Sequence, residues 1–196
     1  MLALSTEDII RSASGLFRKY GMKKTTMEDI AASTGMGKSS LYYYFKNKDA
    51  VYHAVLASEL NAYHDRITEF LMSCDTAYEM ISVLIEKSYL ILRDFPNLLD
   101  ILRTSDGHNN KSAGIIRQEF EKWQQGKLTE LLARGVRFGE FRSMNEGELE
   151  INVQAIGIAM YGLRLELLNE SNETLYAGKT KSLIHLLMNG IGGKDV

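Results

Sequence analysis

The residues whose types and spacing suit a chemical task are concentrated between positions 26 and 49, where the chain reads TMEDIAASTGMGKSSLYYYFKNKD. This stretch combines lysines, serines and three consecutive tyrosines. Side chains of these types are among the groups with which proteins contact DNA phosphates and base edges. The composition of the stretch therefore predicts a DNA-binding surface.

Two short helices joined at a glycine would present that surface. Thr26 can cap the first helix, and Asp29, three residues further on, can complete a capping box. Gly35 follows where the end of a helix favours left-handed backbone. The spacing from Ala31 to Gly35 to Leu41 places a small residue, a turn glycine and an apolar anchor in the order typical of a helix-turn-helix.

The second helix, expected over residues 37–45, has one apolar and one polar face. Leu41 and Phe45 lie four residues apart and therefore share the face that points to the core. The polar residues of the opposite face indicate that this is a recognition helix, which would enter the major groove. The alternative is a solvated helix that is merely rich in tyrosine. The residues predicted to contact DNA are Thr26, Gly37, Lys38, Ser39, Ser40, Tyr42, Tyr43, Tyr44 and Lys48.

This segment resembles the DNA-binding segment of TetR-type transcriptional regulators. The matching positions are Thr26, Ile30, Ala31, Gly35, Leu41, Tyr42, Tyr44, Phe45, Asn47, Lys48, Asp49 and Val51. Together with the preceding IIRSASGLFRKYGMKKTT, the resemblance covers about the first 55 of the 196 residues. Gly37 stands where the family often has serine, and Ser39 where glycine is common, so the operator sequence of a relative does not transfer to this chain.

The resemblance implies a DNA-binding transcriptional repressor that leaves a palindromic double-stranded operator when a small-molecule effector binds its C-terminal domain. A transcriptional activator, or a ligand-independent DNA-binding protein of the same fold, is the alternative. Two other classes remain as rivals. An architectural DNA-bending protein would bind without operator preference, and an enzyme would need a catalytic group in the helical body.

Length and composition fit a folded chain with a basic head. Its 196 residues are 45% hydrophobic and 24% charged, and the net charge is −2. Residues 1–53 carry a net charge of +3 and the remaining residues −5, the asymmetry expected when one end meets phosphate. Cys74 is the single cysteine, so an intrachain disulfide is excluded. The N-terminus lacks a basic leader and the apolar run AIGIAMYGL is too short to span a membrane, so we expect a cytoplasmic protein.

Helical periodicity predicts an all-α fold of about nine helices. A three-helix helix-turn-helix head is expected over residues 1–50 and a helical ligand-binding and dimerisation domain over residues 51–196. Gly21 should close the first helix, and Asn47 should cap a long fourth helix that runs to about Phe70. Later helices are expected over residues 76–94, 98–105 and 112–138, with a loop at 106–111.

The last two helices carry an apolar stripe that steps alternately by four and three residues. Such a 3.5-residue period favours a partner helix lying nearly parallel or antiparallel. We therefore predict a two-fold homodimer through a four-helix bundle, a state that the resembled family also adopts. The alternative is that both helices pack only within one chain. The predicted interface residues are Leu149, Val153, Ile156, Met160, Leu163, Leu167, Leu183 and Leu187.

Large apolar residues of the C-terminal region are candidates for the wall of an effector cavity. The residues predicted to line it are Tyr63, Leu84, Tyr89, Leu102, Phe120, Trp123 and Met160. For any one of them, an ordinary place in the core is the alternative.

Catalytic, cofactor and metal sites are not indicated by the sequence. The four histidines lie at scattered positions, and His53 and His64 are eleven residues apart, which is not the spacing of a metal site. Glycine-rich phosphate loops, the HExxH motif and the nucleophile elbow do not occur in the sequence. We therefore expect neither an enzyme nor a bound cofactor.

Overall fold

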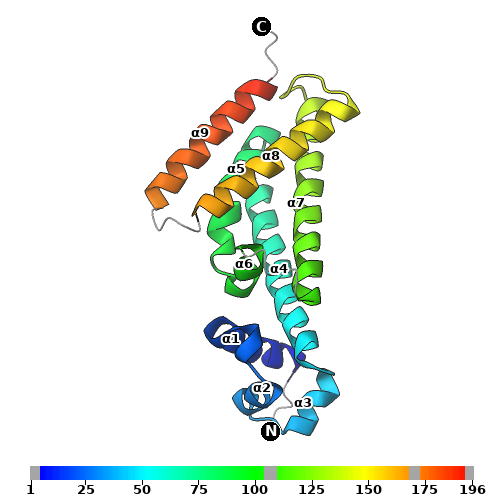
Figure 1. Cartoon of the computed structure of the whole chain (residues 1–196). Coiled ribbons are helices and arrows are strands. Elements are labelled where there is room, and N and C mark those ends of the chain that lie inside the picture. Colours follow the sequence, from blue (N-terminus) through cyan, green and yellow to red (C-terminus); the bar gives the residue numbers. More distant parts are fainter. Residues whose placement is uncertain (1–4, 104–109, 168–172, 193–196) are drawn as a thin grey trace. The chain divides into compact units, whose positions relative to one another are not determined.

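The computed structural model describes residues 5–103, 110–167 and 173–192. Nine helices run through these residues, and the only strand-like pairing among them is an isolated antiparallel bridge between Phe141 and Gly192 (Figure 1). The helices are α1 (Thr6–Lys24), α2 (Met27–Thr34), α3 (Lys38–Tyr44), α4 (Lys48–Met72), α5 (Ala77–Leu92), α6 (Pro96–Arg103), α7 (Lys111–Arg137), α8 (Glu146–Leu167) and α9 (Glu173–Ile191). The predicted all-α fold is confirmed.

The described residues form two compact units. The first takes its residues from Met1–Tyr63 and Phe95–Gln118, and the second from His64–Asp94 and Glu119–Val196. Helices α4 and α7 therefore each contribute residues to both units. The expected division at residue 50 is a division by function, which packing does not test, and it stays a prediction.

Most helix boundaries lie within two residues of expectation. The regular helix breaks at Gly21 as predicted, because Gly21 adopts the non-helical angles φ 79° and ψ 158°, and the range of α1 to Lys24 includes a short turn beyond this break. This region of backbone space is open to glycine and nearly closed to other residues. Helix α6 begins at Pro96, two residues earlier than expected, because proline suits the first turn of a helix. Of the expected loop, residues 106–109 lie outside the described residues.

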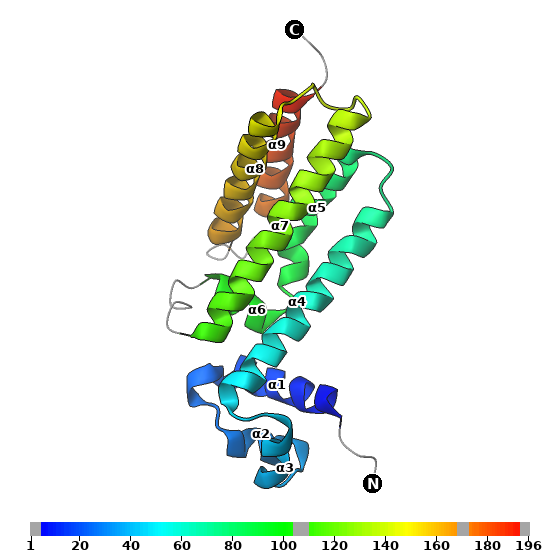
Figure 2. The ribbon, with the colours of Figure 1, turned by 90° about the vertical axis from the view of Figure 1, so that its right-hand side faces the viewer.

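The first unit is built on local caps and a shared core. Helices α1, α2 and α3 lie close together in both views (Figures 1 and 2). Ser5 and Asp8 form a capping box at the start of α1, as Thr26 and Asp29 do at the start of α2. The side chains of Ile9, Ala13, Phe17, Ile30, Ala31 and Leu41 are buried between these helices. Burial of this apolar surface is the main force that holds the three helices together.

In the second unit, helices α8 and α9 lie side by side and α9 also contacts α5 (Figure 2). The Glu140 carboxylate, in the turn after α7, accepts hydrogen bonds from the backbone N–H groups of Ala77 and Tyr78, both at 3.0 Å. It thereby satisfies two of the N–H groups that the first turn of α5 leaves without a partner in the helix. The Arg142 N–H donates to the carbonyl of Ile191 at 3.0 Å and ties the same turn to the end of α9.

Gly135 and Gly126, both in α7, should respond in opposite ways to alanine. A Cβ at Gly135 would lie 2.2 Å from two ring carbons of the buried Phe141, so Gly135→Ala should lower the free energy of unfolding by about 1–3 kcal/mol. A Cβ at the exposed Gly126 would meet nothing within 4 Å. Gly126→Ala should therefore raise the free energy of unfolding by about 0.5–1 kcal/mol, because alanine has a higher helix propensity than glycine. Urea unfolding measures both. Two shifts of the same sign would contradict the packing described for Phe141.

Candidate nucleic-acid interface

The turn between α2 and α3 has the geometry expected of a helix-turn-helix. The Thr26 side chain accepts from the Asp29 N–H at 3.1 Å, while Asp29 accepts from the Thr26 N–H at 2.8 Å and from its hydroxyl at 2.7 Å. These hydrogen bonds, from the Thr26 side chain first, lower the pKa of the Asp29 carboxyl. Thr26 is thus engaged in capping α2, which fixes where the helix-turn-helix begins.

Gly35 ends α2 in the left-handed conformation, with φ 70° and ψ 16°. Its N–H donates to the carbonyls of Ala31 and Ala32, and the Met36 N–H donates to the carbonyl of Ala31 at 3.0 Å. The chain then turns into α3, whose N-cap is Gly37 without a side-chain cap. The open N-terminus of α3 leaves backbone N–H groups available to an acceptor such as a phosphate.

Helix α3 turns its apolar face inward, as the sequence predicts. Leu41 is fully buried and Phe45 is 8% exposed. The tyrosines face outward to different degrees, with Tyr43 87% exposed, Tyr42 44% and Tyr44 38%. The side chains of Lys38, Ser39 and Ser40 are exposed as well. The structure therefore gathers seven of the predicted contact residues, Gly37 to Ser40 and Tyr42 to Tyr44, on one exposed stretch of chain.

Two of the predicted lysines make contacts within the chain. Lys38 forms an ion pair with Glu28 of α2, and this hydrogen-bonded pairing raises the pKa of Lys38 and lowers the pKa of Glu28. Lys48 Nζ donates to the carbonyl oxygens of Thr25 at 2.7 Å and Lys23 at 3.3 Å, so it caps the end of α1. Lys48 therefore holds the head together, in addition to any contact it makes with DNA.

Three exposed lysines of the first unit were not among the predicted contacts. Lys46 follows α3, and Lys23 and Lys24 lie in the last turn of α1. The net charge of +3 over residues 1–53 indicates that this region has a basic surface, but it does not show which lysines form that surface. They extend the basic surface of the first unit beyond the recognition helix.

A polar network joins three helices of the first unit. The Glu59 carboxylate of α4 accepts from the Leu98 N–H at 2.8 Å, from Asn97 Nδ2 at 2.6 Å and from the Ser14 hydroxyl at 3.0 Å. Asn97 Nδ2 also contacts Ser14 Oγ at 3.0 Å. Glu59 thereby caps the N-terminus of α6 and connects it to α1, because it accepts from donors on both helices.

The start of α7 is fixed to the start of α4 in the same unit. Asp49 accepts from the Ser112 hydroxyl at 2.9 Å and from Asn110 Nδ2 at 3.0 Å. Nearby, the Tyr52 ring packs edge-on against Phe17 with centroids 5.0 Å apart, and burial, aided by the carboxylates around it, raises the pKa of Tyr52 to about 12. The phenol therefore stays protonated well above neutral pH.

The predicted effector-cavity residues separate into two groups. Tyr63 and Leu102 are buried in the first unit, where the Tyr63 ring meets Phe95 edge-on at 6.4 Å. The other five belong to the second unit. Of these, Leu84 is fully buried, and Trp123 stacks on His64 with ring centroids 4.1 Å apart.

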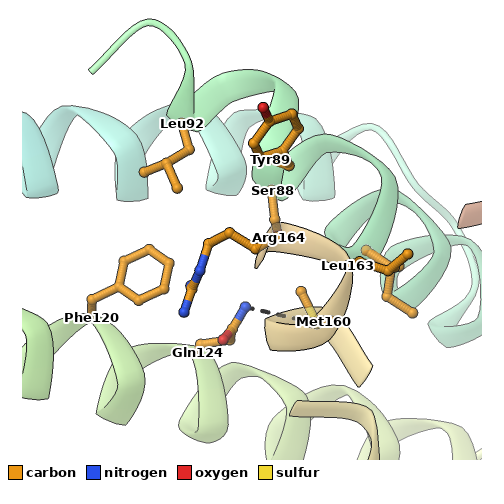
Figure 3. Close-up of a pocket in the computed structure, with 9 residues that line it drawn as sticks. Ser88, Tyr89, Leu92, Phe120, Gln124, Met160, Leu163 and Arg164 are labelled. Carbon is orange, nitrogen blue, oxygen red and sulfur yellow. Dashed lines mark hydrogen bonds between the residues drawn. The ribbon is translucent and has the colours of Figure 1, made fainter. Parts of the chain in front are cut away.

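Tyr89, Phe120 and Met160 do line a cavity in the second unit (Figure 3). It measures about 20 Å³, room for about one water molecule. Its remaining lining residues are Ile85, Ser88, Leu92, Gln124, Leu163 and Arg164. The prediction considered only large apolar residues and therefore missed the polar residues of the cavity wall. The sequence does indicate one of them, because Arg164 interrupts an otherwise apolar run, AMYGLRL.

His64 belongs to the same unit but not to the cavity wall. Burial lowers its pKa from the ordinary value of 6.5 to about 4, so the imidazole is neutral at pH 7. Among the described residues, no group of three or more His, Cys, Asp or Glu side chains is arranged to hold a metal ion. Within the same ranges, none of the helices has the length and apolar character needed to cross a bilayer.

The predicted dimer stripe faces the chain's own interior over much of its length. Val153, Ile156 and Met160 are only 5%, 1% and 6% exposed within a single chain, so these side chains leave little surface for a second copy to bury, and their place in a dimer interface stays a prediction. Leu149, Leu163, Leu183 and Leu187 are half-buried, and the side chain of Leu167 lies outside what the structure describes. Among the side chains of these helices that the structure describes, the large apolar ones that are exposed are Ile151, Ile158, Tyr161 and Leu186.

Comparison with known proteins gives this geometry a context. Residues 9–55 match the family described as "Bacterial regulatory proteins, tetR family". The HTH-type transcriptional repressor KstR2 of Mycolicibacterium smegmatis is 30% identical over 137 residues, which cover 69% of this chain and 67% of that protein. The fatty acid metabolism regulator protein of Bacillus subtilis is 24% identical over 194 residues, 95% of each chain.

A solved structure extends the likeness to the fold of the whole chain. The transcriptional regulator FadR from Bacillus subtilis, in complex with stearoyl-CoA, aligns with a TM-score of 0.73 at 23% identity. The alignment covers 95% of this chain and all of that one. At 23% identity this match shows only that the two chains share a fold.

Proposed function

The chain belongs to the TetR family of bacterial regulatory proteins and is a DNA-binding transcriptional regulator, and from this premise we propose that it represses transcription from a palindromic operator and releases that operator when a small molecule binds its second unit. Because an operator lies on the chromosome, we place the protein in the cytoplasm. A transcriptional activator of the same fold is the alternative.

The outward face of α3 is the observation that carries this proposal. Leu41 and Phe45 fix the helix to the head, while Tyr42, Tyr43 and Lys38 remain exposed. A helix held in this way can enter the major groove with the residues at its N-terminal end against base edges. The exposed Lys46 supports a phosphate contact beside it.

We propose that two copies of the chain associate through α8 and α9. Ile151, Ala155, Ile158 and Gly162 are exposed and step along α8 by four, three and four residues. This stripe has the same period as the predicted one but lies two residues further on, on the exposed side of the helix. Leu186, 71% exposed, extends it onto α9. Small residues in the stripe allow helices to approach closely, and a two-fold pairing of such stripes gives a four-helix bundle.

A dimer would set the spacing of the two recognition helices. Successive major grooves on one side of a duplex lie about 34–36 Å apart, so a palindromic operator with half-sites at that spacing is expected. An effector that binds better to dimers with another spacing of the recognition helices would raise the population of those dimers. The coupling free energy would be on the order of 1–3 kcal/mol. Helix α4, which contributes residues to both units, is the element proposed to carry that coupling, and the Glu59 network would pass its movement to α1 and α6.

Operator binding should depend steeply on salt. If the two heads together neutralise about six phosphates, affinity for a genomic fragment selected by the purified protein should fall about 1,000-fold between about 50 and about 200 mM salt. Lys46→Gln should reduce the slope of log affinity against log salt by about 1 for each head. Fluorescence anisotropy of labelled fragments, competed with random DNA, measures both. Affinity independent of salt, or equal for random DNA, would contradict operator recognition.

A further inference from the structure

Glu28 of α2 places a carboxylate on the surface that is proposed to meet DNA. It forms an ion pair with Lys38, the first residue of α3, across the turn between the two helices (Figure 1). Both side chains are more than half exposed, Glu28 at 59% and Lys38 at 54%. The pair therefore lies at the N-terminal end of the recognition helix, which is the end that approaches base edges in a helix-turn-helix complex.

The ion pair keeps both groups charged and holds them side by side. The hydrogen bond between them raises the pKa of Lys38 and lowers the pKa of Glu28, so both are ionised at neutral pH. Asp29, the neighbouring carboxylate, is instead committed to the capping box of α2. An exposed ion pair adds little to the stability of a fold, so the head does not need Glu28 to stay folded.

A carboxylate that approaches DNA meets few groups from which it can accept a hydrogen bond. The phosphates carry negative charge and repel it. In the major groove, the amino group of cytosine is the usual donor to a glutamate, and the O6 and N7 atoms of the paired guanine are acceptors for a lysine. One G·C base pair therefore offers a partner to Glu28 and a partner to Lys38, which the ion pair already holds next to each other.

We propose that Glu28 determines specificity at one G·C base pair of each operator half-site, where it accepts a hydrogen bond from the cytosine amino group and keeps Lys38 against the guanine. This proposal rests on the proposed function and adds a residue outside α3 to the reading of the operator. Without Glu28, the Lys38 ammonium would be free to reach a phosphate, a contact that strengthens binding to any sequence. Glu28 thus contributes to the discrimination between operator and random DNA rather than to total affinity.

Selection of bound duplexes from a randomised library, with full-length wild type and full-length Glu28→Gln, tests the proposal. The wild type should select a palindrome in which one G·C pair per half-site is preferred by about 5- to 150-fold, the range for one base contact. Glu28→Gln should lose the preference at this pair and keep the others. Lys38→Gln should lose it at the same pair. On random DNA, Glu28→Gln should bind more tightly, with a slope of log affinity against log salt steeper by about 1 for each head.

Two controls separate this role from a general change in charge. Glu7→Gln removes an exposed carboxylate from the first turn of α1, makes the same change in net charge, and should keep every base preference of the wild type. In a Lys38→Gln background, Glu28→Gln should leave the salt slope unchanged, because the steeper slope requires the released lysine.

Three outcomes would overturn the proposal while operator recognition stands. They are unchanged base preferences in Glu28→Gln, a preference lost at an A·T pair instead, and a salt slope that steepens equally with and without Lys38. If the wild type selected no palindrome at all, the proposed function would be contradicted, and the role of Glu28 with it.

Discussion

Ile158→Glu is expected to leave the chain folded and to convert a dimer into monomers. The Ile158 side chain is 72% exposed on α8, so a carboxylate there remains hydrated in the single chain but would be buried against its symmetry mate in a dimer. Operator affinity should fall at least about 100-fold, because two linked heads bind more tightly than either alone. Sedimentation equilibrium measures the mass, circular dichroism the fold, and anisotropy the affinity.

Ile156→Glu, two residues earlier on the same helix, is the matched comparison. Its side chain is 1% exposed, so the carboxylate would be buried in the chain's own bundle at a cost of several kcal/mol. We expect this variant to lose helical structure rather than to become a folded monomer. If Ile156→Glu gave a folded monomer while Ile158→Glu remained a dimer, the stripe inferred from the sequence alone would be right and the exposed stripe wrong.

The contrast between these positions shows why the sequence predicted the period of α8 but not its orientation. Two stripes of the same 3.5-residue period run along the helix, two residues apart. The more apolar one includes Val153 and Ile156, and apolar content alone selects it as the interface. In the structure that stripe fills the intrachain core, and the exposed stripe contains Ala155 and Gly162. Only tertiary packing distinguishes the two.

The helix-turn-helix was predictable because its determinants are local. Capping of α2 by Thr26 involves a residue three positions away, and the left-handed Gly35 is required by the turn itself. The inward face of α3 follows from the four-residue spacing of Leu41 and Phe45. Each of these features depends on fewer than ten neighbouring residues, which a single sequence displays.

The polar contacts that hold the first unit together were not predictable in the same way. Lys48 lies 23 residues from Thr25, and Glu59 lies 39 residues from Leu98. A lysine in a DNA-binding motif suggests a phosphate contact, and its internal role as a cap emerges only when the two helices are brought together. The polar residues of the cavity wall were missed for a related reason, because large apolar residues occur in every core and the distinctive members of this wall are Arg164 and Gln124.

Leu41→Ala is expected to abolish operator binding by unfolding the head. Leu41 is fully buried where α3 meets the rest of the head, and truncation of a buried leucine costs about 2–5 kcal/mol. This is a large fraction of the stability of a small helical unit, so we expect the first unit to open and operator affinity to fall more than about 100-fold. Hydrogen exchange of α2 and α3 amides, together with anisotropy on operator DNA, measures the two effects.

Tyr43→Ala, on the opposite side of the same helix, should weaken operator binding without loss of stability. Tyr43 is 87% exposed, so its removal should change the free energy of unfolding by no more than about 0.5 kcal/mol. A lost contact with DNA costs about 1–3 kcal/mol, which corresponds to an affinity about 5- to 150-fold lower. Tyr43→Phe separates the hydroxyl from the ring, since full affinity in this variant would assign the contact to the ring face. Wild-type affinity in Tyr43→Ala, with weak binding in Leu41→Ala, would mean that α3 supports the head but does not itself touch the operator.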